Sequence, residues 1–173
     1  MTETVSAPPL GGVLETALYV DDMSRAVDFF AGVLGLSAMM RNDRLTAFDA
    51  GPSSVLLIFA RGASRADVTG SGGTIPGHDG NGRLHMAFAI AADDYDGWKA
   101  RLLNHAVSIR SEVQWPAGGQ SVYFEDQTAM CSSSRRRGFE QLLRHIFYAP
   151  VSAFYSIRSF AEFSLSYRVV LLV

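Results

Sequence analysis

Apolar and polar positions follow the same succession of spacings twice along this chain. Residues 13–20 and 83–90 are apolar and rich in β-branched or aromatic side chains, which is typical of buried strands. Each is followed by apolar residues at helical spacing, over 23–34 and 95–103. Further strands are predicted over 36–40, 45–49 and 55–60 in the first half and over 107–115 and 120–124 in the second.

The helix boundaries are marked by residues of known capping behaviour. Asp21-Asp22 and Asp93-Asp94 can each cap a helix, and Gly35 can end the first one. The inward faces are expected to hold Met23, Ala26, Val27, Phe30, Val33 and Leu34 in the first helix and Tyr95, Trp98, Leu102 and Leu103 in the second.

The two leading strands match each other position for position. Leu14–Val20 (LETALYV) aligns with Leu84–Ile90 (LHMAFAI), which places Glu15 and His85 at equivalent positions. Both side chains can bind metal, so the repeat predicts a pseudo-two-fold site where they meet. Alanines two residues further on leave room for an ion and a bound molecule. The alternatives are a water-facing Glu15 on an edge strand and a hydrogen-bonded core His85.

The pattern divides the chain into five segments and predicts an α+β fold. These are a flexible arm (1–12), a βαβββ module (13–60), a Gly-rich loop (61–82), a second βαβββ module whose last strand is missing or replaced (83–126), and a tail (127–173). A glycine-rich loop of this length is typical of a linker or a binding loop.

Composition narrows the class of protein. The net charge of −2 gives no broad basic field, so we expect no nucleic-acid partner. A single cysteine, Cys131, excludes an internal disulfide framework and suits a reducing compartment. The sequence predicts neither a signal peptide nor a membrane-spanning run, and hence a cytoplasmic protein.

The tail differs from everything before it. Residues 127–173 contain six Arg, no Lys and only Glu140 and Glu162 as acids, whereas residues 1–126 carry a net charge of −6. A linker or a small basic patch would explain the run CSSSRRR at 131–137. We favour a reading-frame shift. With one C restored after the Asp126 codon, the permitted codons read DPDGHVLELATPG, a turn and then a strand with a central Glu. The next restored codons can be a Phe or Leu and then a stop that spans Phe139 and Glu140. In that case the tail has no evolved function.

These modules resemble the vicinal oxygen chelate superfamily, which comprises glyoxalases, bleomycin resistance proteins and dioxygenases. The resemblance rests on LETALYVDDMSRAVDFFAGVLGL (14–36), GRLHMAFAI (82–90) and WPAGGQSVYFED (115–126). It implies paired βαβββ modules forming a cupped mixed sheet around a metal site, commonly in a homodimer. The implied metal ligands are Glu15, His85 and the Glu lost after Asp126. The segment 55–59, which supplies a ligand in glyoxalases, is entirely apolar here.

The resemblance implies a divalent ion, Fe, Mn, Zn or Ni, bound weakly or not at all by the printed chain because the third ligand is absent. His78 on the Gly-rich loop is a candidate for closing over a small-molecule ligand, or else a solvated loop residue. Trp115 and Tyr123 fit the lining of a cavity and plain core packing equally well.

Three functions remain open at this point. The first is a metal-dependent lyase, isomerase or dioxygenase acting on a small oxygenated molecule. The second is a non-catalytic protein of the bleomycin-resistance kind that binds an antibiotic or another small molecule. The third is an inactive frameshifted product. The substrate and the reaction are not encoded in any motif of the sequence.

Overall fold

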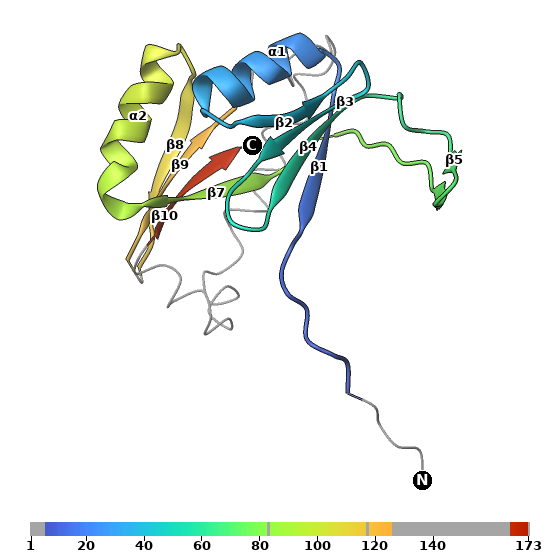
Figure 1. Ribbon diagram of the computed structural model, residues 1–173. Helices are drawn as coiled ribbons and strands as arrows, with labels where there is room; N and C mark the ends of the chain where they lie inside the picture. The colour runs from blue at the N-terminus through green and yellow to red at the C-terminus, as the bar shows by residue number, and fades with distance from the viewer. Residues whose placement is uncertain (1–5, 83, 117, 126–166, 173) are drawn as a thin grey trace. The chain divides into compact units, whose positions relative to one another are not determined.

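The computed structural model describes residues 6–82, 84–116, 118–125 and 167–172. It divides into two compact units, Met1–Gly80 and Asn81–Val173, each containing a four-stranded sheet (Figure 1). The α+β class is thereby confirmed. Residues 6–14 form neither helix nor strand and are exposed to solvent.

The first unit contains the predicted strand–helix–three-strand succession. Its sheet has the order β1-β4-β3-β2, with β1 parallel to β4 and the other neighbours antiparallel. The elements are β1 (Glu15–Val20), α1 (Met23–Val27), η1 (Asp28–Val33), β2 (Ala38–Arg41), β3 (Leu45–Asp49) and β4 (Val55–Ala60).

The first helix begins and ends where the sequence predicts, but it widens in between. The Asp22 side chain accepts a hydrogen bond from the Arg25 amide at 3.0 Å, and Gly35 takes a left-handed φ of 74° after the last turn. The η1 segment is a π-helix, in which the Leu34 amide donates to the Phe29 carbonyl at 3.1 Å. A π-turn contains an extra residue, so Phe29 is buried beside Phe30 although the regular helical pattern omits it.

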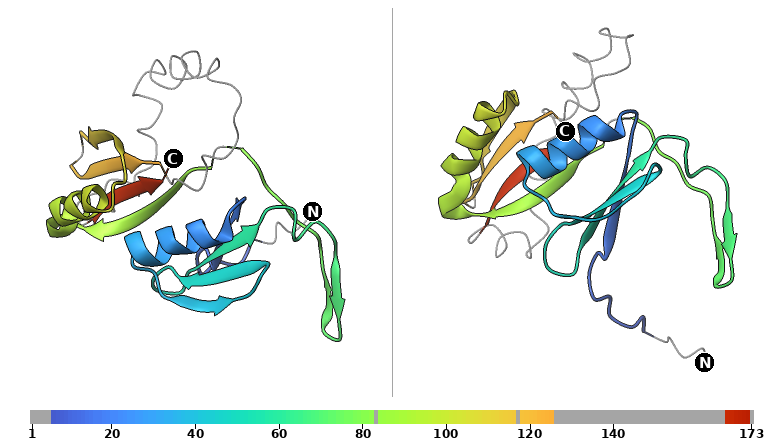
Figure 2. Two further views of the ribbon diagram at one scale, coloured as in Figure 1. Left: turned by 90° about the horizontal axis from the view of Figure 1, so that it is seen from above. Right: turned by 45° about the horizontal axis from the view of Figure 1, so that its top comes forward.

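The Gly-rich loop is partly ordered into a hairpin, which the sequence pattern does not predict. Strands β5 (Val68–Gly70) and β6 (Gly73–Ile75) pair antiparallel around Ser71 and Gly72. The hairpin projects from the edge of the first unit in Figure 1 and in both views of Figure 2.

The second unit repeats the arrangement as far as its third strand. Its elements are β7 (Met86–Ala91), η2 (Ala92–Asp94), α2 (Tyr95–Asn104), β8 (Ile109–Gln114), β9 (Gln120–Phe124) and β10 (Tyr167–Leu172). The prediction for its helix is wrong in two details. Leu103 is 60% exposed, since it lies one position beyond the stripe that contains buried Tyr95 and Leu102. Asp94 makes no side-chain capping bond, because a 3₁₀ turn precedes the helix.

The fourth-strand position of the second sheet is occupied by a segment of the tail. The strand order is β7-β10-β9-β8, so the expected last strand is replaced rather than missing. The remainder of the tail (126–166, with Cys131) lies outside the described residues, as do residues 1–5. Within the described part of the chain, no helix is long and apolar enough to cross a membrane.

Candidate functional site

Each sheet has one face against its own helix and one face away from it, which we call the distal face. In the first unit, Phe48 of β3 lies 5.9 Å from Phe30 of the helix, ring centre to ring centre. Strand alternation then places Thr46, Leu56 and Ile58 on the helix side. The distal face carries Glu15, Ala17 and Tyr19 of β1, together with their neighbours Val55, Leu57 and Phe59 of β4.

Glu15 is exposed at the start of the distal row of β1, which is an edge strand of its sheet. It pairs in register with Val55, and its carboxylate makes no hydrogen bond or ion pair with any described residue. This placement is compatible with a metal ligand and equally with the water-facing alternative. Ala17, the next residue of the row, is half-buried and packs against the cluster of Leu45, Ala47 and Phe59.

His85 occupies the matching place in the second unit. It is exposed, directly precedes β7, and shares the phase of Ala87 and Ala89. The buried residue Ile90 belongs to the opposite phase. Glu15 and His85 therefore each begin the row of distal-face residues on the first strand of their unit, which is the equivalence that the sequence repeat predicts.

No complete metal centre is present among the described residues. They contain no group of three or more His, Cys, Asp or Glu side chains arranged to hold an ion. Catalytic zinc sites, for comparison, normally use three protein ligands. The donor set of the described residues is therefore insufficient for the divalent ion that the resemblance implies.

His78 is fixed on the distal face of the first sheet instead of standing free in its loop. Its Nδ1 lies 2.8 Å from the Tyr19 hydroxyl, and its ring meets the Phe59 ring edge-on at 4.6 Å between centres. Its backbone amide donates to the Ser64 carbonyl at 2.7 Å. His78 and Tyr19 thus form a half-buried polar pair four residues along β1 from Glu15.

The loop around His78 is held by charged side chains. The Asp79 carboxylate accepts hydrogen bonds from Arg65 Nε at 2.6 Å and from the Gly62 amide at 3.2 Å. These donors hold the pKa of Asp79 below its ordinary value, the Arg65 bond contributing most. Arg61 donates to the carbonyls of Tyr19 and Gly80 and to Asp21. These hydrogen bonds and ion pairs hold segment 77–80 against the end of β1.

Trp115 and Tyr123 both belong to the distal face of the second sheet. The Trp115 Nε1 donates to the Ser121 Oγ at 2.8 Å, and Ser121 and Tyr123 alternate with the buried helix-side residues Val122 and Phe124. Partial burial raises the pKa of the Tyr123 phenol. Trp115 is 41% exposed, so Trp115 and Tyr123 present an aromatic surface on this face. The Ser121 hydroxyl within this surface is hydrogen-bonded to Trp115.

Two residues of the candidate site are not among those that the sequence pattern predicts. Tyr19 and Ser121 are the hydrogen-bond partners of His78 and Trp115. The phase of Tyr19, which it shares with Glu15 and Ala17 on one strand, is a signal that could have identified it. Ser121 carries no comparable signal, because a serine in a short strand is common.

A sequence profile decides the family. The glyoxalase/bleomycin resistance protein/dioxygenase superfamily profile matches residues 12–128. The chain belongs to this superfamily. The match spans the first unit and the second unit as far as β9, and ends two residues beyond Asp126, before the residues of β10. No curated protein sequence matches the chain.

Solved structures agree with this assignment. The chain is similar to lactoylglutathione lyase from Agrobacterium tumefaciens, at 32% identity over 70% of this chain and 90% of that one, with a TM-score of 0.63. It shares its fold with the fosfomycin resistance protein FosX from Listeria monocytogenes, at 17% identity over 70% and 88% of the two chains, with a TM-score of 0.52. Superfamily membership shows the scaffold, which supports many reactions.

Proposed function

We propose that this scaffold is that of a metal-dependent lyase acting on a small oxygenated molecule, with Glu15 and His85 as two of the metal ligands. The observation that carries the proposal is their equivalence: each is exposed and begins the distal row of the first strand of its unit. The similarity to lactoylglutathione lyase supports the reaction class. A FosX structure that contains Mn(II) supports a divalent ion in this superfamily.

A bound divalent ion would polarise a substrate oxygen as a Lewis acid. The chain's own residues supply the surroundings. Tyr19 and His78 offer a fixed hydrogen-bonding pair on the face that bears Glu15, and the Trp115–Ser121 pair offers an aromatic wall on the face that bears His85. Because the described residues hold no three-donor group, we expect the printed chain to bind the ion weakly.

Metal titration tests the proposal. Calorimetry with Mn²⁺, Zn²⁺, Ni²⁺ and Fe²⁺ should show weak binding that Glu15→Gln and His85→Asn each reduce at least about tenfold, since even the loss of an outer-shell partner of a metal ligand costs about that much. Glu112→Gln is the matched control, because Glu112 lies on the helix side of its sheet, bound to Lys99 at 2.7 Å. Equal binding by all four proteins would contradict the ligand assignment.

The second candidate is a binding protein that traps an aromatic antibiotic without chemistry. The exposed part of Trp115 and the partly buried Tyr123 favour it. A ligand that binds the chelator-treated protein and is lost on Trp115→Ala would support this function over the lyase. A homodimer and a cytoplasmic location remain predictions, and light scattering of the purified chain tests the first of them.

A further inference from the structure

The strand that fills the second sheet runs in the wrong direction for a repeat. In the first unit β4 is parallel to β1 and antiparallel to β3. In the second unit β10 is antiparallel to β7 and parallel to β9. Figure 2 shows β10, in red, between β7 and β9. The two sheets therefore have the same strand order but opposite polarity at this one position.

The connections differ as sharply. Residues 50–54 join β3 to β4, whereas residues 125–166 separate β9 from β10. Everything up to β9 follows the first unit closely, and the superfamily profile ends at residue 128. The break in the repeat, the end of the profile and the change from a net charge of −6 to one of +4 all fall within a few residues of Asp126.

We propose that the native fourth strand of the second unit is encoded in the other reading frame, immediately after Asp126. The restored reading DPDGHVLELATPG begins with Asp126 itself and continues with a Phe or Leu, after which the codons of Phe139 and Glu140 permit a stop. The printed amino acids fix the middle bases of the turn codons P-D-G-H and of the valine that follows, and the codons of the Ser and Arg run at 132–137 permit the strand L-E-L-A-T. The inference concerns the strand and does not depend on the proposed metal chemistry.

The first unit supplies a register for the restored strand. Phe48 and Phe124 are both fully buried on the helix side, so they are the natural equivalents. Counting from them, the restored V-L-E-L-A-T takes the places of Val55 to Ala60. Its two leucines then replace the buried residues Leu56 and Ile58, which is the apolar pattern that the helix side requires.

The restored glutamate takes the place of Leu57 in this register. Leu57 is the partner of Ala17 on the distal face, and the sequence repeat makes Ala87 the equivalent of Ala17. The glutamate is therefore expected opposite Ala87, diagonal to His85. Parallel neighbours lie about 4.8 Å apart, so such a diagonal pair is within reach of one ion. The turn Glu125-Asp126-P-D-G-H precedes the strand.

A disulfide scan of the frame-restored chain tests the strand and its register. The restored chain ends before any cysteine, since Cys131 disappears with the shift. A cysteine in place of the restored glutamate should form a disulfide with Ala87→Cys on mild oxidation and none with Ala91→Cys, which lies four residues along the same row. A bond to Ala91→Cys, or to neither, overturns the proposed register of the restored strand.

Thermal melting in a chelator gives a second readout. The frame-restored chain should melt at least about 5 °C above the printed chain, because a native strand replaces a reversed one. Aspartate in place of the first restored leucine, on the helix side, should abolish the gain, whereas glutamine in place of the restored glutamate should keep it. No gain, or a gain that survives the aspartate, overturns the proposal. A gain with no metal binding supports the strand and contradicts the metal function.

Discussion

At the scale of single residues, polar pairs on the distal faces are fixed by local geometry. Tyr19 and His78 are 59 positions apart, yet their side chains are 2.8 Å from each other. The contact depends on a close approach of backbone: a Cβ on Gly80 would lie 2.6 Å from the Tyr19 ring, and one on Gly77 would overlap the Arg65 carbonyl oxygen. The glycines of this loop therefore allow it to dock.

Removing the Tyr19 hydroxyl should loosen the loop. Tyr19→Phe leaves His78 Nδ1 without its partner, and we expect a loss of about 1 kcal/mol in the free energy of unfolding, measured by urea denaturation. Tyr123→Phe is the matched control on the other distal face and should change stability by less than about 0.5 kcal/mol. Equal losses in both variants would mean that the Tyr19–His78 bond has no special weight.

The glycine prediction contrasts a crowded position with an open one. Gly77→Ala should destabilise the protein by about 1–3 kcal/mol, because the added methyl group meets backbone that cannot move aside cheaply. Gly72→Ala, with nothing within 4 Å of its Cβ, should have little effect on thermal melting. A similar melting temperature for both variants would contradict the docked loop.

At the scale of elements, the sequence pattern was sufficient for the strands and insufficient for the helix faces. Strand β9 lies over 120–124 and β4 over 55–60, as the pattern of apolar positions predicts. Phe29 is buried although the predicted inward face of the first helix omits it, and Leu103 is exposed although the predicted inward face of the second helix includes it. The π-turn adds a residue to the first helix, and the short second helix has a stripe too narrow to include Leu103. Both depend on tertiary packing, which no local period encodes.

The two misjudged side chains give a direct test of the packing. Phe29→Ala should lower the free energy of unfolding by about 3 kcal/mol, because it empties a buried site beside the Phe30 ring. Leu103→Ala should cost less than about 0.5 kcal/mol, since the side chain is mostly in water. Denaturant titration of the two variants measures this; the reverse order would contradict the π-turn.

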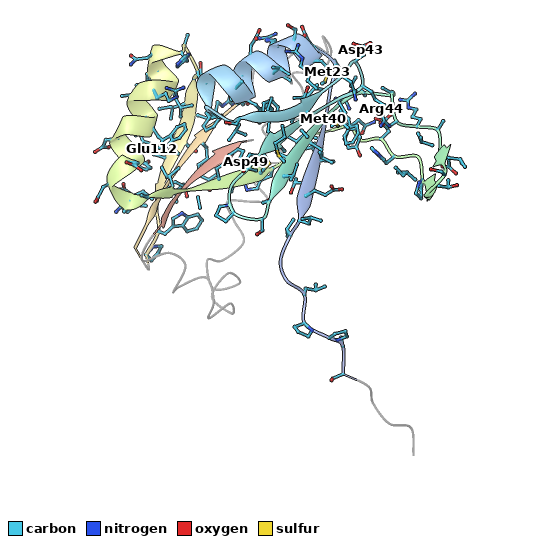
Figure 3. All side chains as sticks on the ribbon, in the orientation of Figure 1. Met23, Met40, Asp43, Arg44, Asp49 and Glu112 are labelled. Atoms are coloured by element: carbon cyan, nitrogen blue, oxygen red, sulfur yellow. The ribbon has the colours of Figure 1, made fainter. Side chains whose placement is uncertain are left out.

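The contact between α2 and β8 should make stability depend on acidity. Figure 3 shows Glu112 on β8 facing α2, where hydrogen bonds from Lys99, the larger effect, and from the Tyr95 hydroxyl lower its pKa from 4.5. A lowered pKa stabilises the fold above the ordinary value, and this stability disappears as the pH falls through the folded value. Melting curves of Glu112→Gln should therefore fall less steeply on acidification than those of the parent, and parallel curves would contradict the contact.

At the scale of the whole molecule, the proposed metal site rests on the repeat of the two units. The equivalence of Glu15 and His85 was visible in the sequence, and the structure places both at the start of a distal row. The docking of His78 was not predictable, because it requires the long loop to return to β1. The reversed polarity of β10 could not be foreseen either, since strand direction at that position depends on which segment reaches it.

The most direct test of the account is the metal content of two purified proteins, the printed chain and the frame-restored chain, prepared without chelator and measured by elemental analysis. Three donors are needed for a stable site, and only the restored chain has a glutamate opposite Ala87. We expect close to one divalent ion per restored chain and far less in the printed chain. Equal metal in both proteins, or none in the restored one, would contradict it.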